Sequence, residues 1–169
     1  GEQYGFHVEE VPAMEVAGRR VSSSAIRKAL AQGELRDAEQ LLGAPYSLYG
    51  PVVHGDQRGR QWGFPTANIP MYRERPPLQG IYAVKVYGPD FVANGVASIG
   101  FRPVFKVKKP LLEVHLLDFD RDIYGQHLRV TFLSRLRDEL FFDTVEALIA
   151  QIQNDITHAR RLFKKNRHW

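Results

Sequence analysis

The sequence predicts a mainly β protein, an antiparallel barrel or sandwich, with a short helical segment before it and one long helix after it. Three observations predict this class. Short alternating apolar runs recur after Tyr46, turn-forming Gly, Pro and Asp residues separate them, and one long helical pattern follows Asp143. The composition agrees, because 169 residues that are 44% hydrophobic and 25% charged fit one well-packed domain with a small appendage.

The sequence pattern of residues 1–43 predicts a short extended piece and two small helices. The serines of Ser22–Ser24 supply N-cap hydroxyls to the first helix, which Gly33 ends, and the second helix ends at Gly43. Elements this short cannot bury much surface by themselves. We therefore expect 1–43 to be an appendage or the end of a larger domain, and 44–169 to be the main domain.

Five later segments carry the strand pattern of alternating apolar residues: Ser47–His54, Ile81–Tyr87, Val92–Ile99, Leu111–Phe119 and Leu128–Leu133. In the fourth segment the apolar residues alternate with Glu113 and His115, so these two polar side chains lie on the opposite face. No helical pattern separates the segments, which favours antiparallel pairing.

The closing helix is expected to begin at Asp143 as N-cap, with Glu146 three residues on as its capping-box partner. Its apolar residues recur at helical spacing and predict one stripe that packs on the barrel: Val145, Leu148, Ile149, Ile152, Ile156 and Ala159.

Charge and cysteine content exclude several classes of protein. The net charge is +4, but the tail 160–169 holds five Lys and Arg and no acid; removing these five from the 23 Lys and Arg leaves 18 against 19 Asp and Glu. The basicity is therefore a feature of the tail. The absence of cysteine excludes disulfides and thiolate chemistry. With no signal segment or membrane-length apolar run, we expect a cytoplasmic protein that binds no membrane. The balance of charges outside the tail argues against nucleic-acid binding, and a monomer is expected.

The densest chemical signal lies between Gly55 and Asn68. Glycines at 55, 59 and 63 predict a loop whose backbone can approach a ligand closely, and backbone amides of this kind can hold phosphate. The spacing fits neither a Walker A loop nor G-x-G-x-x-G. Thr66 and Asn68 are oxygen donors two residues apart on one side of an extended chain, and they could hold a hydrated Mg²⁺ beside phosphates.

Glu113 is the second candidate. A carboxylate in mid-strand could act as a general base on a rigid scaffold, but an ordinary outward-facing strand residue has the same pattern. The pattern alone favours the ordinary residue.

The segment that contains Gly55, Gly59 and Gly63–Ile69 resembles the signature loop of riboflavin kinases. Further motifs follow in that family's order: Asn94–Val96, Ile99–Pro103, Leu112–Phe119, Ile123–Gly125 and Leu136–Glu139. The resemblance covers about residues 46–163. It points to the kinase module of the bacterial bifunctional riboflavin kinase/FMN adenylyltransferase.

This resemblance implies a six-stranded antiparallel Greek-key barrel that transfers phosphate from Mg-ATP to the ribityl 5′-hydroxyl of riboflavin. It implies that Glu113 is the catalytic base, and it overturns the ordinary interpretation of that residue. Mg²⁺ would bind Thr66 and Asn68. The residues that would contact ATP are Gly55, Gly59, Gly63, Pro65, Thr66 and Asn68. The residues that would contact the flavin are Arg102, Arg137 and Glu139.

Val21–Arg27 resembles the motif that closes the FMN adenylyltransferase module of the same enzymes. Residues 1–43 are therefore expected to be the remnant of that module, and the adenylylation of FMN to FAD is expected to be absent from this chain. Three residues depart from the usual family pattern, namely Ser98, Val104 and Phe141, and they concern the details of flavin contacts.

Two other hypotheses remain open. One is a small β-barrel that binds nucleic acid through the basic tail, and it predicts salt-dependent binding of single strands without ATP turnover. The other is a non-catalytic module used for assembly in a larger protein, which predicts a folded chain without activity.

Overall fold

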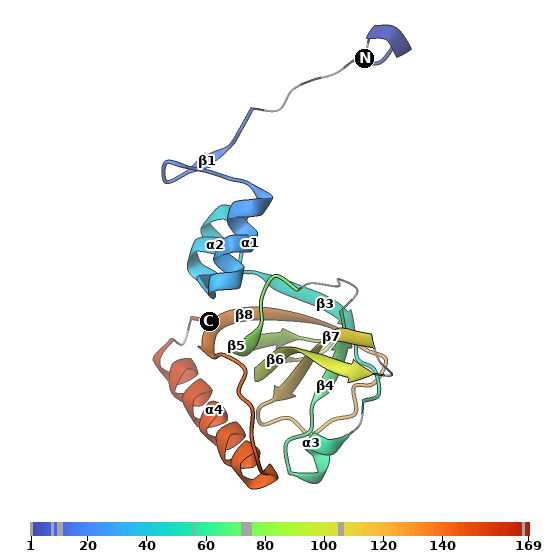
Figure 1. The fold of residues 1–169 in the computed structure, drawn as a ribbon, viewed down its shortest axis with the longest axis vertical. Helices are drawn as coiled ribbons and strands as arrows, with labels where there is room; N and C mark the ends of the chain where they lie inside the picture. Colours follow the sequence, from blue (N-terminus) through green and yellow to red (C-terminus); the bar gives the residue numbers. More distant parts are fainter. Residues whose placement is uncertain are drawn as a thin grey trace.

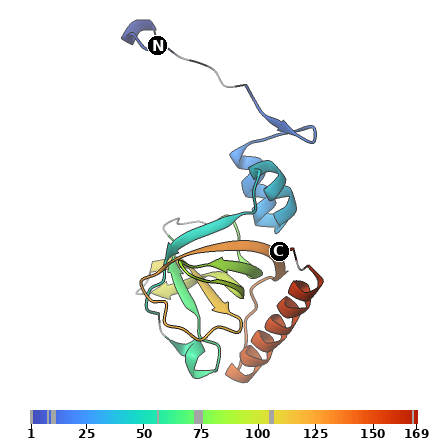
Figure 2. The same ribbon diagram turned by 180° about the vertical axis from the view of Figure 1, so that it is seen from behind.

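The protein is a six-stranded antiparallel barrel with one long helix beside it, and a thin N-terminal segment that projects away (Figures 1 and 2). This computed structural model describes residues 2–7, 9, 12–55, 57–71, 76–104, 107–166 and 168–169, without the side chains of 2, 101–104 and 107–109. In the described part, no helix is long and apolar enough to cross a membrane.

The barrel strands are β3 (Ser47–Pro51), β4 (Ala67–Pro70), β5 (Gly80–Tyr87), β6 (Val92–Val104), β7 (Val107–Leu116) and β8 (His127–Arg137). They pair in the order β3-β8-β5-β6-β7-β4, and every pairing is antiparallel. Strand β8 returns to lie beside β5 of the β5-β6-β7 meander, which is the Greek-key arrangement. The expected fold class is therefore confirmed.

One bridge closes the barrel between its first and last strands in the sheet order. Beyond the end of β3, Val53 pairs with Asn68 of β4, and the Val53 N–H donates to the Asn68 carbonyl at 2.8 Å. Asn68 thus has β7 on one side and Val53 on the other. The place where the barrel closes, which we call the seam, therefore contains Asn68, a predicted metal-binding residue.

Alternating side chains of the strands fill the barrel. Leu112 and Val114 are fully buried, while Glu113 and His115, which alternate with them, are partly exposed on the outer face, as the alternation predicts. Strand β8 repeats the pattern with the fully buried Leu128 and Val130. The outer face of this sheet is therefore where polar groups are held rigidly.

The chain before the barrel contains η1 (Glu2–Tyr4), β1 (Glu15–Val16), β2 (Arg19–Arg20), α1 (Ser23–Gln32) and α2 (Leu35–Leu42). The Ser22 hydroxyl accepts a hydrogen bond from the Ala25 N–H at 3.2 Å, and Gly33 ends α1 in the left-handed conformation at φ 75°, so both predicted helix boundaries are confirmed. Leu30 and Ala38 are 2% and 0% exposed, and they belong to the same apolar cluster as the barrel interior. The two helices bury their apolar face against the barrel.

The last helix is α4 (Val145–Lys165), and its predicted start is wrong by one residue. Thr144, rather than Asp143, is the N-cap: its hydroxyl accepts from the Ala147 N–H at 3.2 Å. The predicted apolar stripe faces the barrel, but Ala159 is its only fully buried member among the described residues, and the stripe's aliphatic side chains are half-buried or exposed. The stripe borders a cavity, as described below.

Two short elements between β3 and β5 were not predicted as such. The glycine-rich loop contains the one-turn helix α3 (Arg58–Gln61), and the extended chain after it is strand β4. Four residues that include Asn68 and Pro70 have little intrinsic strand preference, and pairing with β7 makes them a strand. The predicted strand Ser47–His54 also ends earlier, at Pro51.

Candidate active site

Two cavities open beside the segment Thr66–Asn68. The first has a volume of about 330 Å³ and lies between this segment and the β7–β8 connection, where Phe119–Tyr124 form its far wall. The second has a volume of about 370 Å³ and lies between the outer face of β5–β8 and helix α4. Both volumes are in the range of small-molecule sites.

Gln57, Thr66 and Asn68 line both cavities. Asn68 is only 6% exposed, and its side-chain Nδ2 donates to the Thr66 carbonyl at 3.4 Å. The structure therefore brings the two predicted metal-binding residues together at the junction of the cavities. A ligand in either cavity meets the same two oxygen-bearing side chains.

Each glycine of the predicted loop has its own structural reason. A Cβ on Gly55 would lie 2.5 Å from Nδ2 of Asn68, and a Cβ on Gly59 would overlap the Phe64 carbonyl. Phe64 N–H donates to the Gly59 carbonyl at 2.7 Å, and Gly63 has φ 86°, in the region that favours glycine. The loop is tightly folded on itself and against Asn68. Contact of its amides with phosphate stays a prediction.

Glu113 lines the second cavity together with Thr66 and Asn68. In the strand register it stands between Asn68 of β4 and Ser98 of β6. Because both neighbouring strands hold β7, the backbone that carries this carboxylate is fixed. Glu113 is thus a carboxylate on a rigid cavity wall, beside the junction where the two cavities meet.

His115 fastens the loop to the sheet. Its Nδ1 lies 2.9 Å from the Pro65 carbonyl, and its ring meets the Phe64 ring edge to face at a centroid distance of 5.8 Å. Phe64 and His115 line the second cavity, while Pro65 lines the first. The short segment between α3 and β4 therefore forms a partition that is held in place from β7.

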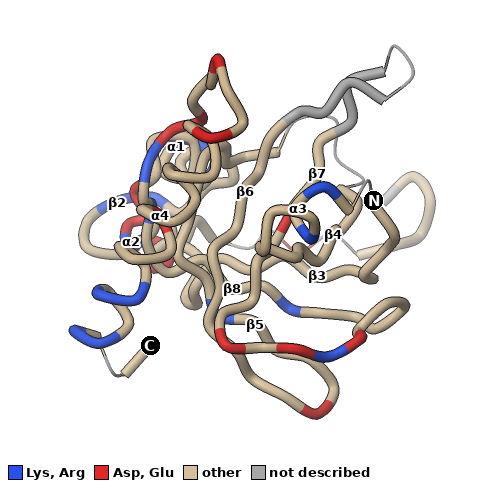
Figure 3. The backbone as a smooth tube through the Cα atoms, turned by 90° about the horizontal axis from the view of Figure 1, so that it is seen from below, with Lys and Arg blue, Asp and Glu red and all other residues tan. Residues whose placement is uncertain are grey.

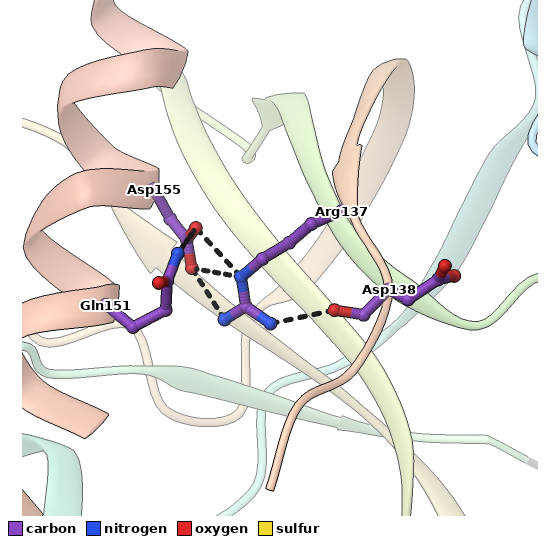
Figure 4. Close-up of polar contacts among 4 residues, drawn as sticks. All are labelled: Arg137, Asp138, Gln151 and Asp155. Atoms are coloured by element: carbon purple, nitrogen blue, oxygen red, sulfur yellow. Dashed lines mark hydrogen bonds and ion pairs between the residues drawn. The ribbon is translucent and has the colours of Figure 1, made fainter. Parts of the chain in front are cut away.

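Arg137, at the end of β8, forms a partly buried ion pair with the buried Asp155 of α4, as Figure 4 shows. Its Nε and Nη2 donate to the two carboxylate oxygens at 2.7–3.0 Å, and Nη1 donates to the Asp138 carbonyl at 2.8 Å. Gln151 adds a hydrogen bond to the same carboxylate at 2.9 Å. Arg137 and Asp155 both line the second cavity.

Of the other two predicted flavin-binding residues, only Glu139 has a described side chain, and it is not among the described residues that line this cavity. The side chain of Arg102 lies outside the described part of the structure. Glu139 lies against Gly100, at a position where a Cβ on that glycine would overlap its carboxylate. Partial burial raises the pKa of Glu139, and the charge of Arg137 offsets part of that rise. Flavin contacts of Arg102 and Glu139 stay predictions.

The basic tail gathers at the end of α4, as the blue segments near the C-terminus in Figure 3 show. Arg160 is held by Asp118 through two hydrogen bonds of 2.7 Å. Lys164 and Lys165 belong to the last turn, where cations are favourable beside the negative end of the helix dipole. This arrangement agrees with a solvated helix end.

Sequence reasoning missed several residues of the site. Gln57 has φ 54° and stands at the junction, and His115 lines the second cavity. Ser98, which the sequence marks only as a departure from the family pattern, lines the second cavity as well. Asp155 could have been found, because it occupies a position of the apolar stripe, three residues after Ile152 and four before Ala159. Gln57 carries no comparable signal. In the described part of the chain, no three His, Asp or Glu side chains are grouped to hold a metal ion.

The riboflavin kinase family (Flavokinase) matches residues 42–163 of the chain. The chain belongs to the riboflavin kinase family. The matched region begins at the end of α2 and includes every barrel strand and nearly all of α4. Both cavities therefore lie within the riboflavin kinase domain.

Curated relatives with the family's activity in their names are similar along nearly the whole chain. The bifunctional riboflavin kinase/FMN adenylyltransferase of Haemophilus influenzae is 44% identical over 95% of this chain and 53% of its own length. The enzyme of Bacillus subtilis with the same name is 41% identical over 88% of this chain and 48% of its own length. The chain spans about half the length of these relatives.

Two solved structures share the fold. The crystal structure of a Streptococcus pneumoniae protein described as a macrolide-efflux protein superposes with a TM-score of 0.77 at 38% identity, over 89% of this chain and 50% of that one. Riboflavin kinase from Trypanosoma brucei superposes with a TM-score of 0.54 at 28% identity, over 73% of this chain and 82% of that one.

Proposed function

We propose that this chain transfers the terminal phosphate of ATP to the ribityl 5′-hydroxyl of riboflavin, giving FMN and ADP. The observation that supports this most is the pair of cavities that share Thr66 and Asn68, inside a domain of the riboflavin kinase family. Phosphoryl transfer needs two substrates that meet end to end, and positioning and charge neutralisation do most of the catalysis. The reaction consumes ATP, so we place it in the cytoplasm.

We assign one substrate to each cavity from the chemistry of its walls. The second cavity has aromatic and aliphatic side chains, among them Trp62, Phe64 and Ile152, which suit a flat, largely apolar ring system. The first cavity has a more polar wall, in which Arg60 and Arg121 stand beside Asp120 and Asp122, and such a wall suits the sugar and phosphates of a nucleotide. Riboflavin would then lie against α4, and ATP would lie beside the β7–β8 connection.

Glu113 lies on the riboflavin side, next to the junction. In the proposed mechanism its carboxylate accepts the proton of the 5′-hydroxyl while that oxygen attacks the γ-phosphorus, and ADP leaves on the other side of Thr66 and Asn68. A general base contributes typically 10²–10⁴-fold to rate. The strands on both sides of Glu113 keep the base in position without further rearrangement.

The donor set fits a magnesium ion that arrives with ATP. Thr66 and Asn68 offer neutral oxygens, and Mg²⁺ is commonly held by few protein ligands together with water and substrate phosphates. The described residues group no three carboxylates or histidines for a permanent metal site, which agrees with a metal shared with the nucleotide. When bound, the ion would neutralise developing charge on the phosphates.

The test is to incubate the purified chain with riboflavin, ATP and Mg²⁺ and to separate the flavins by chromatography with fluorescence detection. We expect FMN that depends on all three additions and stops with EDTA. A folded chain that forms no FMN over many hours at high enzyme concentration contradicts the proposal. The proposal covers phosphorylation alone; with FMN and ATP we expect no FAD from this chain.

A further inference from the structure

The carboxylate of Asp155 is out of place for an ordinary surface helix. It is 6% exposed and, with Ala159, one of the two fully buried residues of α4 in the described part of the chain. A carboxylate at such a position is costly unless it is paired and fully hydrogen-bonded, and replacement of a buried ion pair by apolar residues often preserves stability. Stability alone therefore does not account for an aspartate here.

The contacts of Asp155 fix one group, the guanidinium of Arg137. The contact is bidentate: Nε and Nη2 of Arg137 donate to the two carboxylate oxygens at 2.9 and 2.7 Å. Gln151, from the same helix as Asp155, donates to the carboxylate at 2.9 Å. On the other side of the guanidinium, Nη1 donates a hydrogen bond to the Asp138 carbonyl at 2.8 Å (Figure 4). The guanidinium plane is thus held from both ends.

Arg137 lines the second cavity together with Ile152 and Ile156 of α4. Its side chain is 18% exposed, and the Phe142 ring is 5.9 Å from its Cζ. A guanidinium whose donors are engaged at its edges still offers its face for stacking on a flat aromatic ring. The position of this plane would decide how well such a ring fits.

We propose that Asp155 is a positioning residue for riboflavin: it holds Arg137 in the orientation that the flat flavin ring requires. This inference rests on the proposed function. Asp155 acts through Arg137 and takes no part in the transfer of phosphate. Substitution of Asp155 should therefore weaken riboflavin binding much more than ATP binding.

The same helix offers a matched control. Asp118 and Arg160 form a second two-pronged ion pair between α4 and the barrel, but their side chains are 74% and 46% exposed, and Asp118 lines neither of the two cavities. Asp118 has φ 54°, a conformation that asparagine accepts readily. Asp118→Asn therefore removes an α4 ion pair of the same chemistry without touching either cavity.

The experiment measures riboflavin affinity by the quenching of flavin fluorescence and the KM for ATP by initial rates, for the full chain and its variants. For Asp155→Asn we expect the riboflavin Kd to rise about tenfold, equivalent to ~1.4 kcal/mol. We expect the KM for ATP to stay within about twofold, which is the usual margin for sites without shared contacts. Asp118→Asn should leave both constants unchanged.

A double-mutant cycle tests whether Asp155 acts through Arg137. In an Arg137→Lys background, Asp155→Asn should add little further loss of riboflavin affinity, because the guanidinium that Asp155 positions is already absent. If Asp155→Asn does not fold, Gln151→Ala removes one hydrogen bond of the carboxylate from outside the cavity, and it should weaken riboflavin binding selectively but less.

Two results would overturn the inference. One is unchanged riboflavin affinity in folded Asp155→Asn or, if that variant does not fold, in Gln151→Ala. The other is an equal loss of affinity for riboflavin and ATP, which would show that Asp155 only supports the structure. The failure of the proposed function looks different, because the unsubstituted chain would then form no FMN at all.

Discussion

Gly55→Ala tests the junction of the two cavities directly. The φ of Gly55 lies outside the left-handed region, so alanine can adopt the backbone conformation. The new Cβ would lie 2.5, 2.8 and 2.9 Å from Nδ2, Cγ and Oδ1 of Asn68. Ordinary contact is about 3.5–4.0 Å, so the amide must retreat by roughly 1 Å. All three atoms belong to a side chain, so the fold should survive.

A displacement of this size is enough to change catalysis. Misplacement of a catalytic contact by 1 Å can cost about 10²-fold in rate. We therefore expect kcat/KM for FMN formation to fall by about 10²-fold, and the Mg²⁺ concentration for half-maximal rate to rise. The assay is FMN formation over a magnesium titration. Wild-type rates and an unchanged titration in folded Gly55→Ala would refute the role of the Asn68 amide.

Gly43→Ala is the control for a glycine substitution that affects stability alone. Gly43 has φ 74°, and a Cβ there would meet no atom within 4 Å. Alanine in this conformation costs about 1–2 kcal/mol. This variant should melt a few degrees lower and keep its kcat/KM, so the pair separates loss of stability from displacement of Asn68.

Three further predictions address the base, the core and the pH dependence. Glu113→Gln should lower kcat by about 10²–10⁴-fold with an unchanged KM for ATP, measured by initial rates; unchanged kcat excludes a base at this position. Leu30→Ala should lower the free energy of unfolding of the barrel by about 2–5 kcal/mol in urea titrations, whereas the exposed Leu42→Ala should cost under about 0.5 kcal/mol. Because burial raises the pKa of Glu139, its contribution to stability is complete below the ordinary value of 4.5 and is lost as pH rises through the raised value. Glu139→Gln should remove this decline from a plot of Tm against pH, and parallel plots would contradict it.

The parts of the fold that were predicted correctly are those in which local pattern and tertiary environment agree. Strand β7 alternates apolar and polar residues because one face is buried, so Glu113 and His115 could be placed on the outer face from sequence. The ends of α1 are also marked locally: the Ser22 hydroxyl caps its first turn, and Gly33 adopts the left-handed conformation that ends it. Strand β4 has no such pattern, and only its pairing with β7 defines it.

The site could be predicted only in part, because its two halves have different origins. Thr66, Asn68 and Glu113 carry a family pattern, and the structure brings them to one wall. The opposite wall comes from α4, where an apolar stripe predicts packing and gives no sign of a cavity. A cavity depends on how far a helix stands from the sheet, and no periodicity encodes that distance. Asp155 is the one local signal, a charge within the stripe.

The position of Asn68 explains why the cavities lie where they do. Strands β3 and β4 are consecutive in sequence, yet among the described residues a single bridge, Val53 with Asn68, joins the chain after β3 to β4. The chain between the two strands forms the glycine loop and α3. A barrel that closes through one bridge in its described part leaves space on both sides of that bridge, because the described residues form no longer ladder there. The first cavity uses the side toward the β7–β8 connection, and the second uses the side toward α4. A residue at the seam can therefore face two ligands at once, which a residue in the middle of a continuous ladder cannot do.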